Sequence, residues 1–513
     1  MAAALYICLM GALKNQNTTC KKFIKNNQGF SNIIMKKSII IFLFFFAEIY
    51  SSFAQDDVNI YTHLSLQQCI DIALKNNTDV QSKKLSQETE ETNLMIAKGN
   101  RLPTVNADIT HGANQGRSID PFSNAYVNQN VSFANYGLNT GIVLFNGFAI
   151  QDNIKSNKFS VQAAQQETQQ VKDNLALNVI LGYLNILTNQ DLLEQAKKQK
   201  EVTQKQADRL ETLNANGAIN PGQWYDLKGQ LAADELIIIN TRNSLDVAVL
   251  TLTQLLNIPY TNTINFDRVG LTEAQVQSQL TADSVYETAL SNLAALKAVD
   301  LRKQSANYAV KANRASRYPT LSLNGGVYTN YSSAATTLNF INTTEEQTNA
   351  YIIIDGTQTP VFAKQDNFSN SKLGYGNQFK NNFNTSISIG INIPLLNGLQ
   401  TKARIKNAEI QQKQADITAL AARNTLKQNT AQALFNLQAA QDRYKILEQQ
   451  KDAFTQSYNV ANTRLENGVI NTVEYLIAKN NLDRTSSNLI IARYDYILRN
   501  MVMDYYKGSI TFQ

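Results

Sequence analysis

The sequence predicts a mainly α-helical fold that also contains paired membrane β-strands. Three observations support this prediction: the chain repeats itself, each copy contains a long stretch without proline, and each copy has short segments of alternating apolar and polar residues. Long helices explain the proline-free stretches, because proline breaks a helix interior. Alternation with a period of two residues is typical of β-strands.

The internal repeat is marked by short motifs that recur in the same order. Residues 73–76 (Ala-Leu-Lys-Asn) return 216 residues later as 289–292 (Ala-Leu-Ser-Asn), and Asn216–Asn220 returns 251 residues later as Asn467–Asn471. This change of offset predicts one 35-residue insertion in the second copy. The expected domains are an N-terminal extension with signal peptide (1–54), a first repeat (55–257), an inter-repeat segment (258–282) and a second repeat (283–513).

The N-terminal region has the composition of an export signal. Met35 is followed by two lysines, the apolar run 38–47 and a small-residue cleavage site that ends at Ala54. We expect translation to start at Met35 and cleavage to follow Ala54; the apolar run is too short to span a bilayer. Residues 1–54 account for most of the formal net charge of +6, so the mature chain is close to neutral and no nucleic-acid partner is expected.

The residues needed for catalysis or metal binding are scarce. Cleavage would leave Cys69 as the only cysteine, and His63 and His111 are the only histidines. No disulfide or cluster of metal ligands can be built from this set. The sequence also contains no nucleophile elbow, phosphate loop or paired-carboxylate motif. We therefore expect no enzyme activity, no cofactor and no metal site.

Each repeat begins with an expected helix. In the first repeat it runs from the N-cap Ser65 to about Asn100, with apolar residues of 66–74 at helical spacing. Pro103 follows this helix, and the residue before a proline is disfavoured in helical conformation. The opening helix is therefore expected to be one element of about 35 residues.

Two expected strands come next in each copy. The clearest is Phe383–Ile393, in which apolar residues alternate with Asn, Ser and Gly; Val105, Ala107 and Ile109 show the same pattern. Alternation over about ten residues is typical of a membrane-spanning strand, with its apolar side chains toward lipid and its polar ones toward a wet lumen. A half-buried strand of a soluble sheet has the same pattern; the export signal and the repeated strand pair favour the membrane.

The connections between these strands are expected to be polar, irregular loops outside the cell. They lie near 114–133 and 332–382, and the second contains the insertion. After Gly147 and Gly398 the sequence predicts helices of about 65 residues, or roughly 100 Å. Tight turns at Gly217 and Gly468 then lead into returning helices over about 222–255 and 472–506.

Four strands per chain determine how the protein must assemble. Only helices and closed barrels can cross lipid, because an open sheet edge leaves backbone groups unpaired. Single-chain barrels have at least about eight strands. Two copies of the chain would supply eight strands and three copies would supply 12, so the chain must form an oligomer.

The chain resembles the TolC family of trimeric outer-membrane efflux channels over essentially its whole mature length. The motifs that carry the resemblance are 65–66 with 73–77, the Arg-x-Pro-Thr marks 101–104 and 317–320, Leu144–Gly147 with its copy 395–398, and the two Asn-Gly turns. The resemblance implies long antiparallel helical hairpins that form a trimeric α-barrel, continuous with a 12-stranded β-barrel built from four strands per chain. It places the protein in the outer membrane of a Gram-negative bacterium, with its helices in the periplasm.

The same resemblance implies function and partners. The protein would be the passive exit duct of a tripartite efflux or type I secretion system. Its partners would be two further copies of itself, a periplasmic adaptor (membrane fusion protein), an inner-membrane transporter of the RND, ABC or MFS type, and outer-membrane lipid. Two other hypotheses are open at this point: a soluble periplasmic coiled-coil scaffold, and a surface adhesin that uses the loop 332–382.

The resemblance also assigns roles to the helix tips, which in the family close the periplasmic entrance and contact the adaptor. The corresponding residues are Asn216, Gly217, Ala218, Ile219 and Asn220, and Asn467, Gly468, Val469, Ile470 and Asn471. An Arg that follows the Gly in some family members is absent here, where the residue is Ile470. The network that closes the entrance must therefore differ.

An acidic residue about six positions after the tip Gly marks the constriction in the family. Glu474 matches this position, whereas the first copy has Gln223 there and Asp226 three residues later. Three copies of Glu474 would form an acidic ring that favours cations; the alternative is a solvated charge on a helix surface. Trp224 and its counterpart Tyr475 are expected to be packing residues beside the tip.

Overall fold

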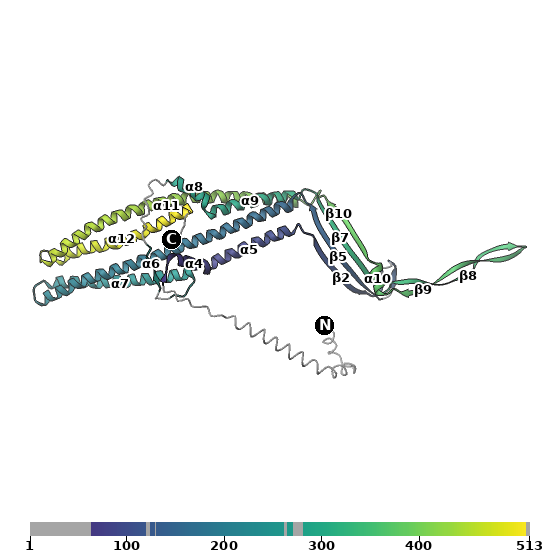
Figure 1. The fold of residues 1–513 in the computed structure, drawn as a ribbon, viewed down its shortest axis with the longest axis horizontal. Helices are drawn as coiled ribbons and strands as arrows, with labels where there is room; N and C mark the ends of the chain where they lie inside the picture. Colours follow the sequence, from purple (N-terminus) through teal and green to yellow (C-terminus); the bar gives the residue numbers. More distant parts are fainter. Residues whose placement is uncertain (1–62, 120–123, 129, 261–263, 270–280, 509–513) are drawn as a thin grey trace, which may run out of the picture. The chain divides into compact units, whose positions relative to one another are not determined.

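A computed structural model describes residues 63–119, 124–128, 130–260, 264–269 and 281–508. The export signal predicted in 1–54, with its start at Met35 and cleavage after Ala54, lies outside these residues. The described part contains two long helical hairpins and a four-stranded sheet whose strands lead directly into them (Figure 1). Within this part of the chain, no helix is both long enough and apolar enough to cross a membrane.

The longest elements are two helices of identical length. Helices α6 (Ala149–Ala215) and α11 (Gln400–Glu466) contain 67 residues each, which corresponds to about 100 Å. Each reverses at a tight turn into a helix of 36 residues, α7 (Pro221–Leu256) or α12 (Thr472–Lys507). The two predicted rods and their returning helices are therefore confirmed.

The opening helix of the first repeat is divided, so the prediction of one helix from Ser65 to Asn100 is wrong. Helix α4 (Leu66–Asn76) and helix α5 (Thr78–Gly99) meet at Asn77, which is extended (ψ 127°). The side chain of Asn77 caps α5 by accepting hydrogen bonds from the first-turn backbone, a competition with helix continuation that is typical of Asn. The N-cap prediction for Ser65 is confirmed by a capping box with Gln68.

The second repeat is divided at the equivalent place without a capping side chain. Helix α8 (Ala282–Asn292) and helix α9 (Ala294–Ala315) meet at Leu293, which is also extended (ψ 128°). The side chain of Leu293 is buried against Leu296 and Leu426. The first break is thus capped by a side chain, whereas the second is accompanied by the packing of Leu293. An apolar residue such as Leu293 gives no signal for a helix break in the sequence.

The two hairpins pack against each other and against the opening helices. Helix α6 contacts α5, α7, α9 and α12, and α11 contacts α8, α9 and α12.

The buried Tyr183 of α6 connects two other segments of the chain. Its hydroxyl lies within hydrogen-bond distance of the carbonyl oxygens of Leu64 (2.9 Å) and Asp267 (2.7 Å). These carbonyls adjoin the short parallel strands β1 (His63–Leu64) and β6 (Asn265–Phe266). Tyr183 thus holds the start of the first repeat and the inter-repeat segment against α6.

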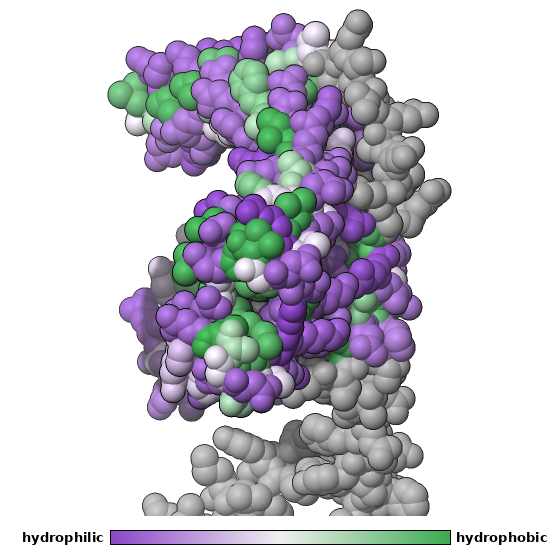
Figure 2. Space-filling model, turned by 90° about the vertical axis from the view of Figure 1, so that its left-hand side faces the viewer, coloured by the Kyte–Doolittle hydropathy of each residue, from purple (hydrophilic) through white to green (hydrophobic). Residues whose placement is uncertain are grey.

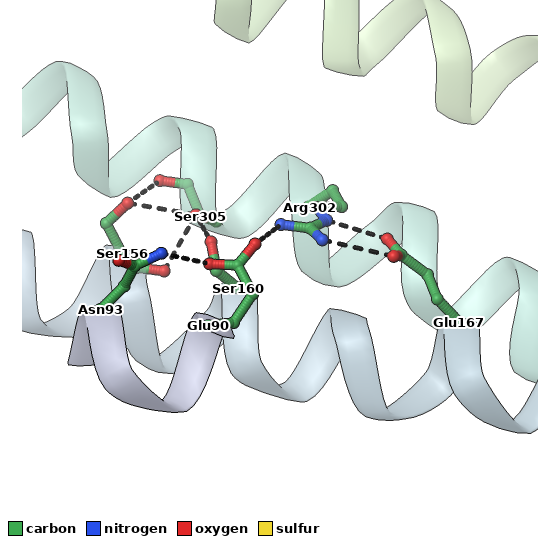
Figure 3. A network of polar contacts seen from close by, with 7 residues as sticks. All are labelled: Glu90, Asn93, Ser156, Ser160, Glu167, Arg302 and Ser305. Carbon is green, nitrogen blue, oxygen red and sulfur yellow. Dashed lines mark hydrogen bonds and ion pairs between the residues drawn. The ribbon is translucent and has the colours of Figure 1, made fainter. Parts of the chain in front are cut away.

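Arg302 joins three helices (Figure 3). From α9, its guanidinium donates to Glu167 on α6 and to Glu90 on α5, each at 2.9 Å. The hydrogen bond that Arg302 donates to Glu167, followed by the one to Glu90, holds the pKa of Arg302 above its usual range. One turn away, the hydroxyls of Ser305 and Ser156 are 3.1 Å apart, and such small side chains allow α6 and α9 to approach closely.

The sheet is antiparallel, with the strand order β10-β7-β5-β2. Its strands are β2 (Thr104–Asn114), β5 (Val131–Phe145), β7 (Thr320–Ser332) and β10 (Asn384–Asn392). All four predicted strands are therefore confirmed. Strands β2 and β10 form the two edges of the sheet, and β5 and β10 lead into the long helices α6 and α11.

The two faces of the sheet differ in polarity, as the alternation predicted. Register places most of the apolar residues of the four strands on one face, which we call the outer face: Val105, Ala107, Ile109, Leu138, Ile142, Leu321, Leu323, Val327, Ile387, Ile389 and Ile391. The opposite, inner face has Asn106, Asp108, Asn139, Asn324, Tyr328, Ser386 and Ser388. Side chains on the outer face are widely exposed in the single chain, with Ile387 at 84 % and Ile109 at 73 %.

The connections between the strands are more ordered than the predicted irregular loops. The first contains a short hairpin of β3 (Arg117–Ile119) and β4 (Tyr126–Asn128). The second, predicted over 332–382, is a long hairpin of β8 (Thr336–Ile354) and β9 (Thr357–Lys372) followed by helix α10 (Tyr375–Asn381). Asp355 and Gly356, both with positive φ, form its two-residue turn, an Asp-Gly signal typical of β-hairpins.

Candidate entrance at the hairpin tips

The turn between α6 and α7 is a Schellman motif. Gly217 has a φ of 68°, a left-handed conformation that glycine adopts without steric cost. Its N–H donates to the carbonyl of Asn214 (2.9 Å), and the N–H of Ala218 donates to the carbonyl of Leu213 (2.9 Å). These two bonds satisfy the last carbonyls of α6, so the chain can reverse within a few residues.

The turn between α11 and α12 has the same geometry. Gly468 has a φ of 69°, and the N–H of Val469 donates to the carbonyl of Arg464 (2.8 Å). Each returning helix is then capped by an Asn side chain: Asn220 accepts from Gly222 N, and Asn471 accepts from Glu474 N, both at 2.9 Å. The repeated motif thus encodes the same reversal twice.

The two tips are packed into one hydrophobic cluster. Leu210 and Leu227 of the first hairpin meet Leu465 and Tyr475 of the second, and Trp224 packs against them. The prediction that Trp224 and Tyr475 are packing residues is confirmed. Figure 2 looks onto the end of the structure where the turns lie, and hydrophobic residues there form separate patches among hydrophilic ones.

Polar contacts add to this cluster. The guanidinium of Arg209 on α6 donates to the carbonyl oxygen of Glu466 at the end of α11 (2.6 Å). The amide of Gln206 donates to the side chain of Asn462 (2.9 Å). Of the turn residues, Ile219 and Ile470 pack into the cluster, whereas Ala218 and Val469 are exposed. At each tip the residue that directly follows the turn glycine is therefore exposed together with the flanking Asn and Gly residues, and the next residue is packed inward.

The predicted constriction residues lie in the first turns of the returning helices. Glu474 is exposed on α12, where a carboxylate also interacts favourably with the helix N-terminus. On α7, Gln223 is half-buried and Asp226 is exposed. No hydrogen bond or ion pair of the described residues joins Glu474 to Gln223 or Asp226. Within one subunit these side chains are therefore separate, and any ring would have to form between subunits.

Sequence reasoning missed a buried charged network farther along the hairpins. Lys479 on α12 is 2 % exposed, and its ammonium lies 3.2 Å from Asp234 on α7 and 2.6 Å from Asp483 on its own helix. Asp234 also accepts hydrogen bonds from the hydroxyl of Thr203 on α6 and from the amide of Gln230 (2.8 Å). The network ties α12 to both helices of the first hairpin.

Burial determines the electrostatics of this network. It raises the pKa of Asp483, an effect that the adjacent Lys479 ammonium opposes. Lys479 and Asp483 have the spacing of a helical ion pair, which the sequence does show. Asp234 lies 245 residues earlier than Lys479, and no periodicity pairs two positions so far apart.

Comparison with known proteins adds the family. Residues 69–257 and 285–500 match the sequence profile of a family described as outer membrane efflux protein. The chain belongs to the outer membrane efflux protein family. The two matched ranges include the first hairpin, all four strands of the sheet, and the second hairpin as far as residue 500 in α12. As a member of this family the chain is a transport protein and not an enzyme.

Individual relatives of this outer membrane efflux protein are distant in sequence. It is 21 % identical over 444 residues to the outer membrane efflux protein BepC of Brucella suis biovar 1 (strain 1330), covering 86 % of this chain and 84 % of BepC. Crystal structures of CusC superpose with a TM-score of 0.70 at 16 % identity, covering 89 % of this chain and 95 % of CusC. The outer membrane protein VceC of Vibrio cholerae has a TM-score of 0.68 at 16 % identity, covering 86 % of this chain and 96 % of VceC.

These likenesses confirm the TolC-like fold that the sequence motifs implied. Long helical hairpins and four strands per chain are present as expected. Membership of an outer-membrane family also argues against the soluble coiled-coil scaffold.

Proposed function

We propose that this protein is the outer-membrane channel of a tripartite efflux or type I secretion system in a Gram-negative bacterium. It acts as a homotrimer that passively conducts substrates to the cell exterior. It receives them from a periplasmic adaptor and an inner-membrane transporter of the RND, ABC or MFS type. The hairpins extend into the periplasm, and the outer face of the sheet contacts outer-membrane lipid.

The observation that carries this proposal is a sheet with two open edges and two unlike faces. Strands β2 and β10 are the edges, and lipid does not tolerate the unpaired backbone groups of an open edge. Three copies would join edge to edge into a closed barrel of 12 strands, with apolar side chains outward and Asn, Ser and Tyr inward. Because the strands lead directly into α6 and α11, the hairpins of the three copies would continue the ring.

Glu474 is our candidate for ion selectivity at the periplasmic entrance. It is exposed in the first turn of α12, and three copies around an axis would place negative charge on the path of every ion. Gln223 and Asp226 occupy the corresponding turn of the first hairpin. The half-buried Gln223 and the exposed Asp226 would line the same entrance, on the helix that the first repeat contributes.

The test is single-channel recording in planar bilayers with detergent-purified mature protein. The wild type is expected to give small, cation-selective currents. In Glu474→Gln the ratio of cation to anion permeability should fall by about threefold or more, because a charged ring at a narrow entrance is removed. Glu211→Gln is the matched control, since it neutralises an exposed carboxylate near the same tips but on α6, and it should keep the wild-type ratio.

Two results would contradict this proposal at different points. A protein that is soluble without detergent and forms no channel would exclude the duct. Channels whose selectivity is unchanged in Glu474→Gln would retain the duct and exclude Glu474 as its selective residue.

The exposed tip residues are our candidates for contact with the adaptor. Val469 is 62 % exposed at the second turn, and Ala218 occupies the same position at the first. A charge placed in an apolar contact is costly, so Val469→Asp should reduce recovery of the co-expressed adaptor with the channel by about tenfold, or about 1.4 kcal/mol. Val460→Asp is the control: Val460 is 59 % exposed on α11, away from the turn.

Conductance separates a lost contact from a misfolded channel. Val469→Asp should still form channels in planar bilayers while it loses the adaptor. Equal recovery of the adaptor with Val469→Asp and wild type would show that the turn is not the contact surface.

A further inference from the structure

Helix α10 packs on the outer face of the sheet. Its residue Phe379 has its ring 5.8 Å from that of Tyr136, and the carbonyl of Phe379 accepts a hydrogen bond from the hydroxyl of Thr329 (2.8 Å). The ring of Tyr375 lies 4.6 Å from that of Tyr331, tilted by 37°, and its hydroxyl is hydrogen-bonded to that of Tyr136. Register places Tyr136, Thr329 and Tyr331 on the same face as Ile109, Leu138 and Val327.

The attachment of α10 is specific. The side chain of Gln378 is 1 % exposed. Its amide oxygen accepts from Ser332 N (2.9 Å), while its nitrogen donates to the carbonyls of Ser332 (2.9 Å) and Leu373 (2.7 Å). Below the helix Ala134 is fully buried. One side of α10 is therefore fixed to the end of β7, and its position on the face is determined.

The part of α10 that the sheet leaves uncovered is amphipathic, because the two aromatic rings that contact the sheet are covered on one side only. Tyr375 is 46 % exposed and Phe379 is 44 % exposed. Asn377, Lys380 and Asn381 are also exposed. Aromatic rings beside amide and ammonium groups are the composition found where a membrane surface meets water.

The location of α10 along the strands agrees with a membrane boundary. Helix α10 covers the first residues of β5 and the last residues of β7, next to Thr329. These are the strand ends that are farthest from the helices α6 and α9. From Thr320 to Thr329 a strand covers about 30 Å, or about 23 Å along the membrane normal at a tilt of about 40°. The apolar band of outer-membrane barrels is about 25 Å tall. Helix α10 therefore lies where the apolar outer face ends.

We propose that α10 is an interfacial helix that binds outer-leaflet lipid at the boundary between the acyl chains and the headgroups. The rings of Tyr375 and Phe379 rest at this boundary, and Lys380 with its neighbouring amides faces the headgroups. The inference rests on the proposed function, because it requires the outer face of the sheet to lie in lipid. It goes beyond that function, because it assigns a lipid contact to α10, which has no counterpart among the described residues between β2 and β5 (115–119, 124–128 and 130).

The experiment measures the depth of single tryptophans in vesicles. Trp224 is the only tryptophan, so Trp224→Phe gives a background in which one new indole reports its own surroundings. Phe379→Trp probes α10, Ile389→Trp probes the middle of the outer face, and Ile353→Trp probes the end of the β8–β9 hairpin. Each variant is reconstituted in phosphatidylcholine vesicles whose lipids carry bromine either near the headgroup or deep in the acyl chain.

The three positions should give three different quenching patterns. Bromine near the headgroup should reduce Phe379→Trp fluorescence by about half and exceed the effect of deep bromine, as an interfacial ring requires. Ile389→Trp should be quenched mainly by deep bromine, and Ile353→Trp by neither. Tyr375→Trp, one helical turn earlier on α10 and also partly exposed, repeats the measurement independently of the Phe379 site.

The outcomes separate the failure of this inference from the failure of the proposed function. If Ile389→Trp is quenched but neither α10 variant is, the interfacial helix is excluded and the membrane barrel stands. If the α10 variants match Ile389→Trp in depth, α10 lies within the apolar band and the inference is again overturned. If Ile389→Trp is not quenched in any vesicle, the membrane location itself is wrong.

Discussion

Lys479 is the most completely enclosed charged side chain among the described residues, and it lies between the two repeats. Its ammonium is paired with Asp234 of the first hairpin and with Asp483 of its own helix. Taking these charges out of water is costly, and good geometry with additional hydrogen bonds offsets most of that cost. The pairing therefore specifies which surfaces of the hairpins meet more than it adds to stability.

Removing one partner of this network should strongly destabilise the folded protein. Lys479→Met leaves Asp234 buried at 3 % exposure without its cation, and we expect a loss of about 3–5 kcal/mol in the free energy of unfolding. The measurement is unfolding in detergent followed by far-ultraviolet circular dichroism. The double variant Lys479→Met with Asp234→Asn should recover part of the loss, since the two sites share one interaction.

The control for this prediction is an exposed ion pair between α6 and α7, next to Asp234 in the sequence. Lys200 and Glu235 form an ion pair of 2.9 Å with side chains 37 % and 52 % exposed. Lys200→Met should cost about 0–1 kcal/mol. A similar cost for Lys200→Met and Lys479→Met would show that burial does not determine the effect.

The sequence predicts single residues well where the reason is local. Ser65 as an N-cap, the turn glycines and Pro221 at the start of α7 all follow from backbone chemistry within a few positions. The pairing of Lys479 with Asp234 does not, because it depends on how two helices separated by hundreds of residues meet. The assigned role of Glu474 came from resemblance, and a single subunit leaves it solvent-exposed.

At the scale of elements, each tip turn depends on the backbone conformation of its glycine. A Cβ built on Gly217 meets nothing within 4 Å, so the cost of a substitution comes from its φ of 68° alone. The same holds for Gly468. The turns are therefore sites where conformational strain can be measured without steric clash.

Gly217→Ala should lower the free energy of unfolding by about 1–2 kcal/mol, the cost of a left-handed residue with a Cβ. Gly229→Ala is the matched control, because its Cβ also meets nothing within 4 Å but the residue lies inside α7. There the same substitution should stabilise by about 0.5–1 kcal/mol. Opposite signs in thermal unfolding would support the argument; a loss at both positions would contradict it.

Two elements were predicted incorrectly for identifiable reasons. The opening helices break at Asn77 and Leu293, and only the first has a side chain that competes for backbone hydrogen bonds. The polar composition of 332–382 predicts an irregular loop, whereas the structure has a long hairpin there. Thr-rich and Asn-rich strands with exposed faces also form hairpins, and the Asp355-Gly356 turn was the local signal for one.

On the scale of the whole molecule, the repeat predicted two hairpins and a sheet, and both are present. It did not predict that the two tips share one cluster, because hydrophobic periodicity shows which face of a helix is buried and not which helix covers it. Nor does one subunit complete a barrel. We propose closure of the barrel because the edge strands β2 and β10 must be paired in a membrane.

A ring of subunits makes one more prediction about charge. Asp108 is the only Asp, Glu, Lys or Arg in β2, β5, β7 and β10, and it lies on the inner face, where Asn139 donates a hydrogen bond to it (2.8 Å). In a trimer, three carboxylates would face a wide aqueous lumen. Salt screens charges beyond about 10 Å at 0.1 M and about 30 Å at 0.01 M.

Asp108→Asn should therefore reduce cation selectivity at about 0.01 M salt and leave it unchanged at about 1 M, where screening acts within about 3 Å. Reversal potentials across planar bilayers measure this directly. Asn106→Ala, a neutral change on the same face, should match wild type at both salt concentrations. Identical selectivity of Asp108→Asn and wild type at low salt would show that the inner face does not line the conducting path.

The identical lengths of α6 and α11 couple the evolution of the two repeats. One residue inserted into α6 alone would advance the helix by about 1.5 Å and turn everything beyond it by about 100°. Leu210 would leave the tip cluster, and the first turn would no longer be level with the second. Insertions and deletions in the helices are therefore tolerated only as matched events in both copies. An insertion in one copy alone is instead expected in the connections between the strands, at the end of the sheet away from the helices, where the second repeat has the β8–β9 hairpin.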